Sequence, residues 1–151
     1  MTEFKIHNTY GNKKEVFIPN DPENIKVYAC GPTVYDYAHI GNARMAVVCD
    51  LLIKVLKELY PRVTYVSNIT DIDDKIIKAA TENNTPIEEL TDKFSKIYNE
   101  DMLVLGVQLP DLQPRATQHI DKMINLISNL IENDFAYFTN AHVLFSVKKY
   151  S

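Results

Sequence analysis

Hydrophobic positions follow two different spacings in the first half of the chain. Residues 25–30 and 63–67 are short, mostly apolar runs typical of buried strands. Between them, apolar residues recur every three or four positions from 43 to 59, which predicts a helix that ends at Tyr60-Pro61. Two strands joined by a helix are typical of a parallel sheet, so the pattern predicts an α/β fold with flanking helices.

The rest of the chain is predicted to form hairpins and helices. The hairpins are expected at residues 4–7 with 15–18 and at 136–139 with 143–147, and the helices at 72–83, 87–105 and 117–133. The last helix carries a regular apolar stripe, which predicts a face packed in the core.

Composition is that of an ordinary globular protein. The 151 residues, 46% hydrophobic and 24% charged, predict one domain with a single core. The chain has no apolar run of membrane-spanning length and no signal-peptide pattern at its start, so we expect no membrane partner and a cytoplasmic location. The two cysteines are too few for a disulfide scaffold, and Cys49 is expected to be a buried thiol. The net charge of −4, without a basic stripe, argues against extensive RNA binding by this chain alone.

A thiol and a glycine-flanked histidine lie on one predicted strand-to-helix connection. Cys30 ends the strand, and His39-Ile-Gly-Asn42 lies at the start of the helix. Unpaired N–H groups and the positive end of the helix dipole favour an anion there, and Gly41 has no Cβ to hold a phosphate away. Ligands of parallel sheets bind beyond the carboxyl ends of the strands, where the segment 68–71 is also expected.

These motifs together resemble those of cysteinyl-tRNA synthetases, a family of class I aminoacyl-tRNA synthetases. The resemblance rests on Cys30-Gly-Pro-Thr-Val-Tyr-Asp36 and His39-Ile-Gly-Asn42. It continues in Asn68-Ile-Thr-Asp-Ile-Asp-Asp-Lys-Ile76 and Pro114-Arg-Ala-Thr117. The family signature usually ends in His where this chain has Asn42, so a role for Asn42 must be uncharged hydrogen bonding.

The resemblance implies a Rossmann-like nucleotide-binding fold, of which this chain would be the first half. Residues 1–133 would belong to the catalytic domain, with the hairpin in 1–20, and residues 134–151 would begin an inserted connective region. The lysine-rich ATP loop of the family would lie outside this chain, because Lys93-Phe-Ser-Lys-Ile97 falls within a predicted helix. An N-terminal part of this kind is expected to be inactive alone.

The resemblance also assigns roles to residues. His39 and Asn42 would be catalytic, and the ATP-binding residues would be Pro32, Thr33, Val34, Tyr35, Asp36, His39, Ile40, Gly41 and Asn42. Cysteine would contact Gly31, Thr70 and Asp71, the last two near its ammonium group, and Cys30 would be one ligand of a zinc ion that binds the substrate thiolate. From the residues alone, Cys30 also fits a structural role. Thr70 and Asp73 likewise fit a helix-capping box, and a paired-carboxylate metal site is the weaker alternative there.

The activity implied is that of a cysteine-tRNA ligase, which uses ATP, Mg²⁺ and Zn²⁺ to activate L-cysteine and transfers it to tRNA(Cys). Most tRNA contacts would come from regions outside this chain. Three alternatives stay open: a cysteine ligase of the mycothiol type, a small nucleotidylyltransferase, and a non-catalytic nucleotide-binding module. The second lacks support, because no late Ser/Thr-Arg element accompanies the histidine motif.

Overall fold

The structure is a computed structural model that describes residues 3–150, which divide into two compact units. Unit 1 comprises residues 3–30, 38–67 and 98–113, and unit 2 comprises residues 31–37, 68–97 and 114–150. Each unit has its own cluster of buried hydrophobic side chains. The expectation of a single core is therefore wrong, because the chain passes repeatedly between the units and divides its apolar positions between them.

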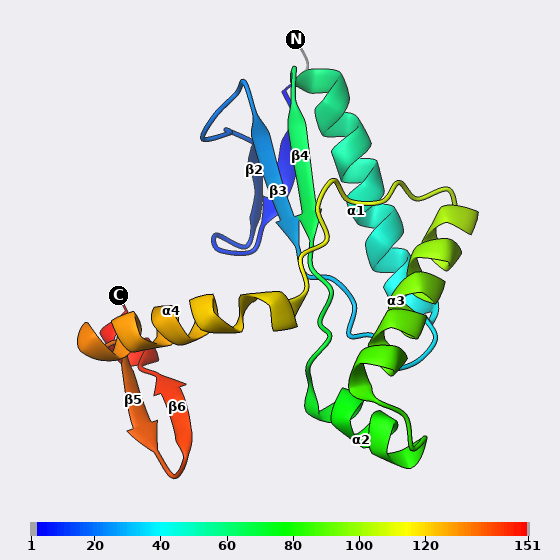
Figure 1. Ribbon diagram of the computed structural model, residues 1–151. Helices are drawn as coiled ribbons and strands as arrows, with labels where there is room; N and C mark the ends of the chain where they lie inside the picture. The colour runs from blue at the N-terminus through cyan, green and yellow to red at the C-terminus, as the bar shows by residue number, and fades with distance from the viewer. Residues whose placement is uncertain (1–2, 151) are drawn as a thin grey trace. The chain divides into compact units, whose positions relative to one another are not determined.

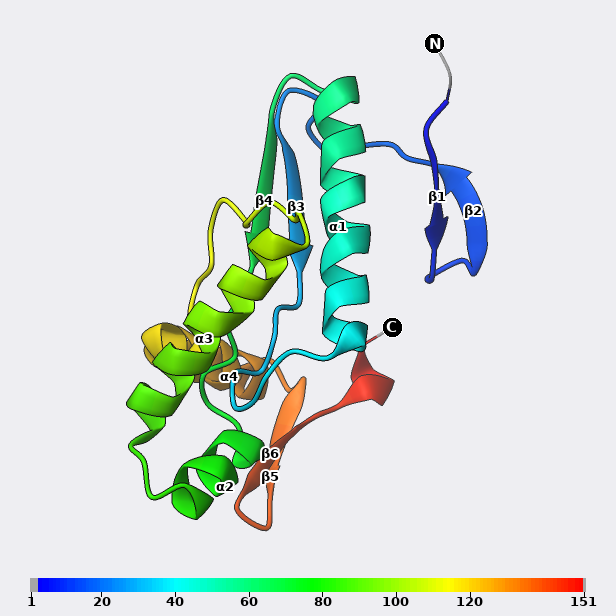
Figure 2. The ribbon, with the colours of Figure 1, turned by 90° about the vertical axis from the view of Figure 1, so that its right-hand side faces the viewer.

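Unit 1 contains the predicted strand-helix-strand arrangement. Strands β3 (Ile25–Ala29) and β4 (Val63–Ser67) pair in parallel, with Ile25 opposite Val63. Helix α1 (Ile40–Leu59) connects them and runs alongside both strands (Figures 1 and 2). The predicted α/β fold with a parallel sheet and flanking helices is confirmed, and the helix begins three residues earlier than the apolar spacing indicated.

A further segment continues this sheet in unit 1. Residues 111–113 run parallel to β4, because the N–H groups of Asp111 and Leu112 donate to the Tyr65 carbonyl and the Ser67 N–H donates to the Leu112 carbonyl. The Asp111 carboxylate also accepts from the Tyr65 N–H at 2.7 Å. This segment was not predicted, because prolines precede and follow it in the sequence.

The predicted N-terminal hairpin is confirmed in unit 1. Strands β1 (Lys5–Asn8) and β2 (Lys13–Val16) pair antiparallel. The ring of Phe17 lies 5.8 Å from that of Phe4 and 6.1 Å from that of Tyr60, measured between centroids. These edge-to-face contacts connect the hairpin to the end of α1.

Two buried titratable groups of unit 1 have shifted pKa values. Burial alone would raise the pKa of Asp50, but hydrogen bonds from Lys54 Nζ and the Gln108 N–H, with the lysine charge, lower it below its usual value. Burial and the neighbouring Cys49 thiol raise the pKa of Tyr65 to about 12. Cys49 itself is half-buried, with its Sγ 3.7 Å from Met45 Sδ, so its predicted burial is only partial.

Unit 2 is mainly helical. Its elements are α2 (Asp74–Glu82), the first part of α3 (Ile87–Val104), the 3-10 turn η1 (Ala116–His119), α4 (Ile120–Glu132), the hairpin of β5 (Ala136–Thr139) and β6 (His142–Phe145), and the 3-10 turn η2 (Val147–Lys149). Its core packs α2 and α3 around Ile76, Leu90 and Phe94. The predicted helices and hairpin are present, and residues 93–97 lie within α3, as expected.

The start of α2 differs from the predicted capping box. Asp73 is the N-cap, and its carboxylate accepts the Lys75 N–H at 2.9 Å. Thr70 is not a cap, because its backbone bonds to the loop at Pro32 and Val34. An N-cap must lie directly before the first helical residue. Asp73 meets that condition, whereas Thr70 lies three residues too early.

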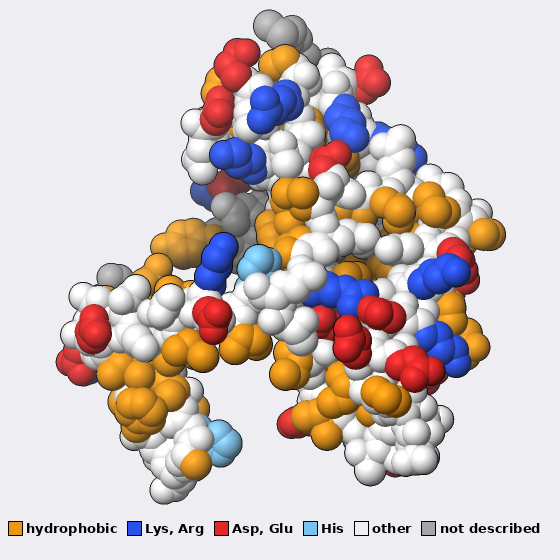
Figure 3. Space-filling view, in the orientation of Figure 1, with side chains coloured by type: hydrophobic (Ala, Val, Ile, Leu, Met, Phe, Trp, Pro, Cys, Tyr) orange, Lys and Arg blue, Asp and Glu red, His pale blue; other side chains and the backbone are white. Residues whose placement is uncertain are grey.

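The apolar stripe of α4 is mostly exposed, contrary to the prediction of a core face. Ile124 is 54% exposed and Met123 41%, and Figure 3 shows hydrophobic side chains at the surface over α4 and the β5–β6 hairpin. Within unit 2 this helix contacts η1 and β5. Periodicity therefore predicted the helix correctly but could not show what covers its apolar face. Across residues 3–150, no helix is both long and apolar enough to cross a bilayer.

Candidate functional site

His39 is the N-cap of α1 and uses its side chain to close the first turn. Its Nδ1 accepts the Gly41 N–H at 3.0 Å, and the side-chain Oδ1 of Asn42 accepts the His39 N–H at 3.1 Å. The two bonds form a reciprocal capping box. Asn42 thus acts through an uncharged hydrogen bond, as the sequence requires, and its described contact is with His39.

This cap assigns the tautomer of His39. A nitrogen that accepts a backbone N–H carries no proton, so in the neutral imidazole the proton resides on Nε2. The ring is exposed and lies at the positive end of a helix of 20 residues. His39 therefore offers a hydrogen-bond donor at a place that favours negative charge.

The predicted cradle of open backbone N–H groups is not found at this helix start. The Gly41 N–H donates to the His39 ring, and the N–H groups of Asn42 and Ala43 donate to the His39 carbonyl. The absence of a Cβ at Gly41 has a different consequence from the one expected, because a Cβ there would lie 2.7 Å from His39 Cε1. Gly41 makes room for the imidazole. Ile40, the first residue of α1, is largely exposed.

Cys30 directly follows β3 in unit 1, and its side chain is exposed. It lies at the carboxyl end of a parallel strand, as expected, and its role as a zinc ligand stays a prediction. A tetrahedral zinc site needs three or four protein ligands. Residues 3–150 contain no group of three or more His, Cys, Asp or Glu side chains arranged to hold a metal ion. The described residues therefore do not form a zinc site by themselves.

In unit 2, the loop that begins at Gly31 is bonded to the segment that follows β4. The Thr70 N–H donates to the Pro32 carbonyl at 2.9 Å, and the Val34 N–H donates to the Thr70 carbonyl at 3.2 Å. Thr33 and Thr70 form a parallel bridge. Two of the residues predicted to contact cysteine, Gly31 and Thr70, are thus brought together with the predicted ATP-binding loop.

The side chain of Asn68 strengthens this arrangement. Its Oδ1 accepts the Gly31 N–H at 2.9 Å, and its Nδ2 donates to Thr70 Oγ1 at 3.1 Å. Pro32 and Val34 are buried, so their side chains support the loop. Asn68 belongs to one of the sequence motifs, but no role was predicted for it. Its place directly after a buried strand was the available signal.

Asp71 is only 3% exposed, and both of its carboxylate oxygens are engaged. Oδ1 accepts the Thr117 N–H at 3.0 Å, and Oδ2 accepts the Thr117 hydroxyl at 2.6 Å. The Ile69 N–H also donates to the Pro114 carbonyl, and the Ala116 N–H donates to the Ile69 carbonyl. Asp71 therefore connects the segment that follows β4 to the turn before α4, and it brings the two sequence motifs into contact.

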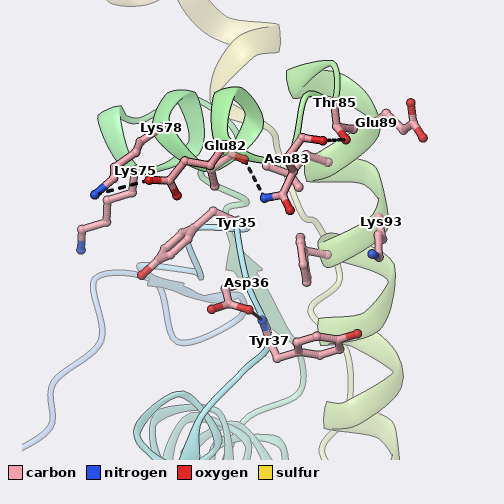
Figure 4. A pocket seen from close by; sticks show the side chains of 13 residues that line it. Tyr35, Asp36, Tyr37, Lys75, Lys78, Glu82, Asn83, Thr85, Glu89 and Lys93 are labelled. Carbon is pink, nitrogen blue, oxygen red and sulfur yellow. Dashed lines mark hydrogen bonds and ion pairs between the residues drawn. The ribbon is translucent and has the colours of Figure 1, made fainter.

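Tyr35 and Asp36, both predicted to bind ATP, line a pocket of about 660 Å³ in unit 2 (Figure 4). The pocket is bounded by α2 and the start of α3. Lys75 Nζ lies 5.9 Å from the centre of the Tyr35 ring, and Asp36 Oδ1 accepts the Tyr37 N–H at 2.8 Å. Lysines and carboxylates occur in equal number among its lining residues, so the pocket has no net charge that favours an anion.

The predicted site residues thus form two sets. Unit 1 holds Cys30, His39, Ile40, Gly41 and Asn42, and unit 2 holds Gly31, Pro32, Thr33, Val34, Tyr35, Asp36, Thr70 and Asp71. Each set is ordered by hydrogen bonds that the linear motifs did not reveal. Their assigned roles in binding and catalysis stay predictions.

Comparison with known proteins gives one family. Residues 16–151 match the family described as tRNA synthetases class I (C) catalytic domain. Curated proteins named cysteine-tRNA ligase are similar over almost the whole chain: one from Pelagibacter ubique is 54% identical over 147 residues, which are 96% of this chain. Others from Gluconobacter oxydans and Maricaulis maris are each 49% identical, over 97% and 99% of the chain. The chain spans about a third of the length of these relatives, 32% or 33%.

Proposed function

Since the chain belongs to the family of class I (C) tRNA synthetase catalytic domains, we propose that it supplies ATP- and cysteine-binding groups of a cysteine-tRNA ligase. In the first proposed step, a carboxylate oxygen of cysteine attacks the α-phosphorus of ATP, the bond to the bridging oxygen of the β-phosphate breaks, and pyrophosphate leaves. In the second, a hydroxyl of the terminal tRNA ribose takes the cysteinyl group and AMP leaves.

The geometry of His39 is the observation that carries the proposal. Its Nδ1 is occupied by the Gly41 N–H, so Nε2–H is the group that can donate to a phosphate oxygen. Negative charge grows on the phosphates as pyrophosphate leaves, and a fixed donor at the positive end of a helix stabilises it. Asn42 holds the backbone of His39 and thereby supports this donor.

The cysteine-binding groups are proposed in unit 2. Gly31 and Thr70 are fixed by the hydrogen bonds of the loop and of Asn68, which supports a role that needs exact positioning of the substrate. The buried carboxylate of Asp71 adds negative charge to the same segment, which favours a nearby ammonium group.

Metal ions and tRNA belong to the proposal for the whole protein. Cys30 is proposed as one zinc ligand, and Mg²⁺ as the ion that accompanies ATP. Zinc would add selectivity, because a thiolate binds it far better than the hydroxyl of serine does. We also propose that residues 1–133 form the first half of the catalytic domain, that residues 134–151 begin a connective region, and that tRNA(Cys) is bound mostly by other parts of the protein.

The test is titration of the chain with ATP and with L-cysteine, in which binding is measured by NMR or calorimetry. Weak binding of both is expected. His39→Ala is expected to lower the ATP affinity about tenfold or more, because a hydrogen bond to a charged group is lost, and to leave cysteine affinity within about twofold. His142→Ala, which changes an exposed histidine on β6, is the matched control.

Equal losses for ATP and cysteine would contradict the role of His39. The chain alone is expected to show no aminoacylation, since it spans about a third of its relatives. Detectable charging of tRNA by the purified chain would contradict that expectation. Binding of ATP without any binding of cysteine would favour a nucleotide-binding module instead.

A further inference from the structure

Asn68 joins two of the groups proposed to contact cysteine, although no role has been assigned to it. Its amide has a definite orientation, because the Gly31 N–H is a donor and must face the amide oxygen. The Nδ2 group therefore faces Thr70 Oγ1, at 3.1 Å, and donates to it. The hydroxyl of Thr70 accepts in this contact.

The main chain of Thr70 is fixed independently of Asn68. Its N–H donates to the Pro32 carbonyl, and its carbonyl accepts the Val34 N–H. Asn68 therefore affects the side chain of Thr70, by fixing the direction of its hydroxyl proton. Because Nδ2–H occupies one lone pair of Oγ1, the hydroxyl proton must point away from Asn68. Within residues 3–150, no hydrogen bond donated by this hydroxyl is found.

We propose that Asn68 is a positioning residue that makes the Thr70 hydroxyl a hydrogen-bond donor to the carboxylate of the substrate cysteine. The inference rests on the proposed function and refines it, because it assigns the Thr70 hydroxyl to the carboxylate of cysteine instead of to the ammonium group that the resemblance implied. A carboxylate only accepts hydrogen bonds, so it matches a hydroxyl whose proton is directed outward. An ammonium group only donates, so it would use the remaining lone pair of Thr70 Oγ1 and leave the outward proton without an acceptor.

An exchange of one atom at position 68 reverses this arrangement. Asn68→Asp keeps an oxygen for the Gly31 N–H but replaces the Nδ2 donor with an acceptor. The Thr70 hydroxyl then donates to the new carboxylate, and its proton is no longer available to the substrate. Thr70→Val removes the hydroxyl with little change in shape, and Thr70→Ser retains it.

Two analogues of cysteine separate the two ends of the substrate. The compound 3-mercaptopropionate keeps the carboxylate and lacks the ammonium group, whereas cysteamine keeps the ammonium group and lacks the carboxylate. Binding of each to the ¹⁵N-labelled chain is measured by NMR titration under reducing conditions, for the original chain and for each variant. Asn129→Asp, on the exposed surface of α4, is a control with the same change of charge.

Asn68→Asp and Thr70→Val are each expected to weaken 3-mercaptopropionate and cysteine about tenfold or more, and cysteamine less than about twofold. The double variant is expected to bind no more weakly than Thr70→Val alone, since Asn68 acts through that hydroxyl. Thr70→Ser and Asn129→Asp are expected to bind all three as the original chain does. Thr70→Val keeps the Gly31 bond, so it tests the proposal even if Asn68→Asp fails to fold.

Three results would overturn the inference while leaving the proposed function intact. The first is that Asn68→Asp or Thr70→Val weakens the binding of 3-mercaptopropionate and of cysteamine equally. The second is that the losses of affinity add up in the double variant. The third is that Thr70→Val binds 3-mercaptopropionate as tightly as the original chain does. If the original chain binds none of the three thiols, the proposed cysteine-binding function of this chain fails first, and the role of Asn68 fails with it.

Discussion

Replacing Gly41 with alanine is expected to move the imidazole of His39 while leaving the stability of α1 nearly unchanged. An added Cβ would lie 2.7 Å from His39 Cε1, closer than Cβ atoms come to other atoms in folded proteins, and 3.0 Å from Nδ1, which is a tight contact. The Cβ would be attached to the backbone of α1, which the hydrogen bonds of the helix hold in place, whereas the imidazole ring of His39 can rotate. The ring therefore gives way, and its bond to the Gly41 N–H is lost.

Two opposing effects decide the stability of this variant. Loss of a side-chain cap costs about 1 kcal/mol. Alanine in a helix is favoured over glycine by about 0.8–1.0 kcal/mol. The sum is close to zero, so the melting temperature is expected to stay within about 4 °C of the original value. ATP affinity is expected to fall about as much as in His39→Ala, because Nε2–H no longer occupies its place.

Thermal unfolding followed by circular dichroism, together with calorimetric titration of ATP, tests the reasoning. The same substitution made in the His39→Ala background meets no imidazole, so there it is expected to stabilise the chain by about 0.8–1.0 kcal/mol. Gly11→Ala is the matched control, since its Cβ would meet only the flexible side chain of Lys13. Unchanged ATP affinity in Gly41→Ala, or destabilisation that persists without His39, would refute the account.

Three further predictions concern buried polar groups. In urea titrations, Asp71→Ala is expected to lower the free energy of unfolding by about 2–4 kcal/mol, and Thr117→Val by about half as much. The first substitution removes two hydrogen bonds to the carboxylate, and the second removes one. Equal losses of unfolding free energy in the two variants would contradict this. Burial acts to raise the pKa of Asp50, but the hydrogen bonds from Lys54 and the Gln108 N–H and the nearby lysine charges together lower it. Its stabilisation is therefore present above about pH 4 and is lost as the pH falls through the folded-state pKa. The difference in the free energy of unfolding between the original chain and Asp50→Asn is therefore expected to shrink as the pH falls. A difference that does not change with pH would contradict this role of Asp50. Burial raises the pKa of Tyr65 to about 12, so its contribution is lost as the pH rises from about 10 towards 12, and Tyr65→Phe is expected to lack that alkaline decline in unfolding titrations.

The strand-helix-strand part of unit 1 could be predicted because its signals are local. An apolar run, a three-to-four spacing and the Tyr60-Pro61 stop lie within one stretch of chain, and β4 occurs with the predicted bounds. The segment 111–113 could not be found in this way. Its hydrogen bonds go to Tyr65 and Ser67, more than forty residues away, and the prolines around it indicate a loop.

The candidate site shows the same division. The motifs identified His39, Gly41 and Thr70 as residues of interest, but they did not show that Nδ1 of His39 is occupied by a backbone N–H. Nor did they show that the Asp71 carboxylate is engaged by Thr117, 46 residues further along. Roles that depend on which lone pair is taken require the positions of atoms.

The type of most elements, the α/β class and the family could be predicted from the sequence, because these depend on residue spacing and on motifs that are local in the chain. The three-dimensional packing was needed to show that the apolar positions divide into two cores and that the α4 stripe is largely exposed. It also decided which hydrogen-bonding groups remain available to a ligand. Burial and hydrogen-bond pairing depend on what lies across from a residue in space, and no local pattern records that.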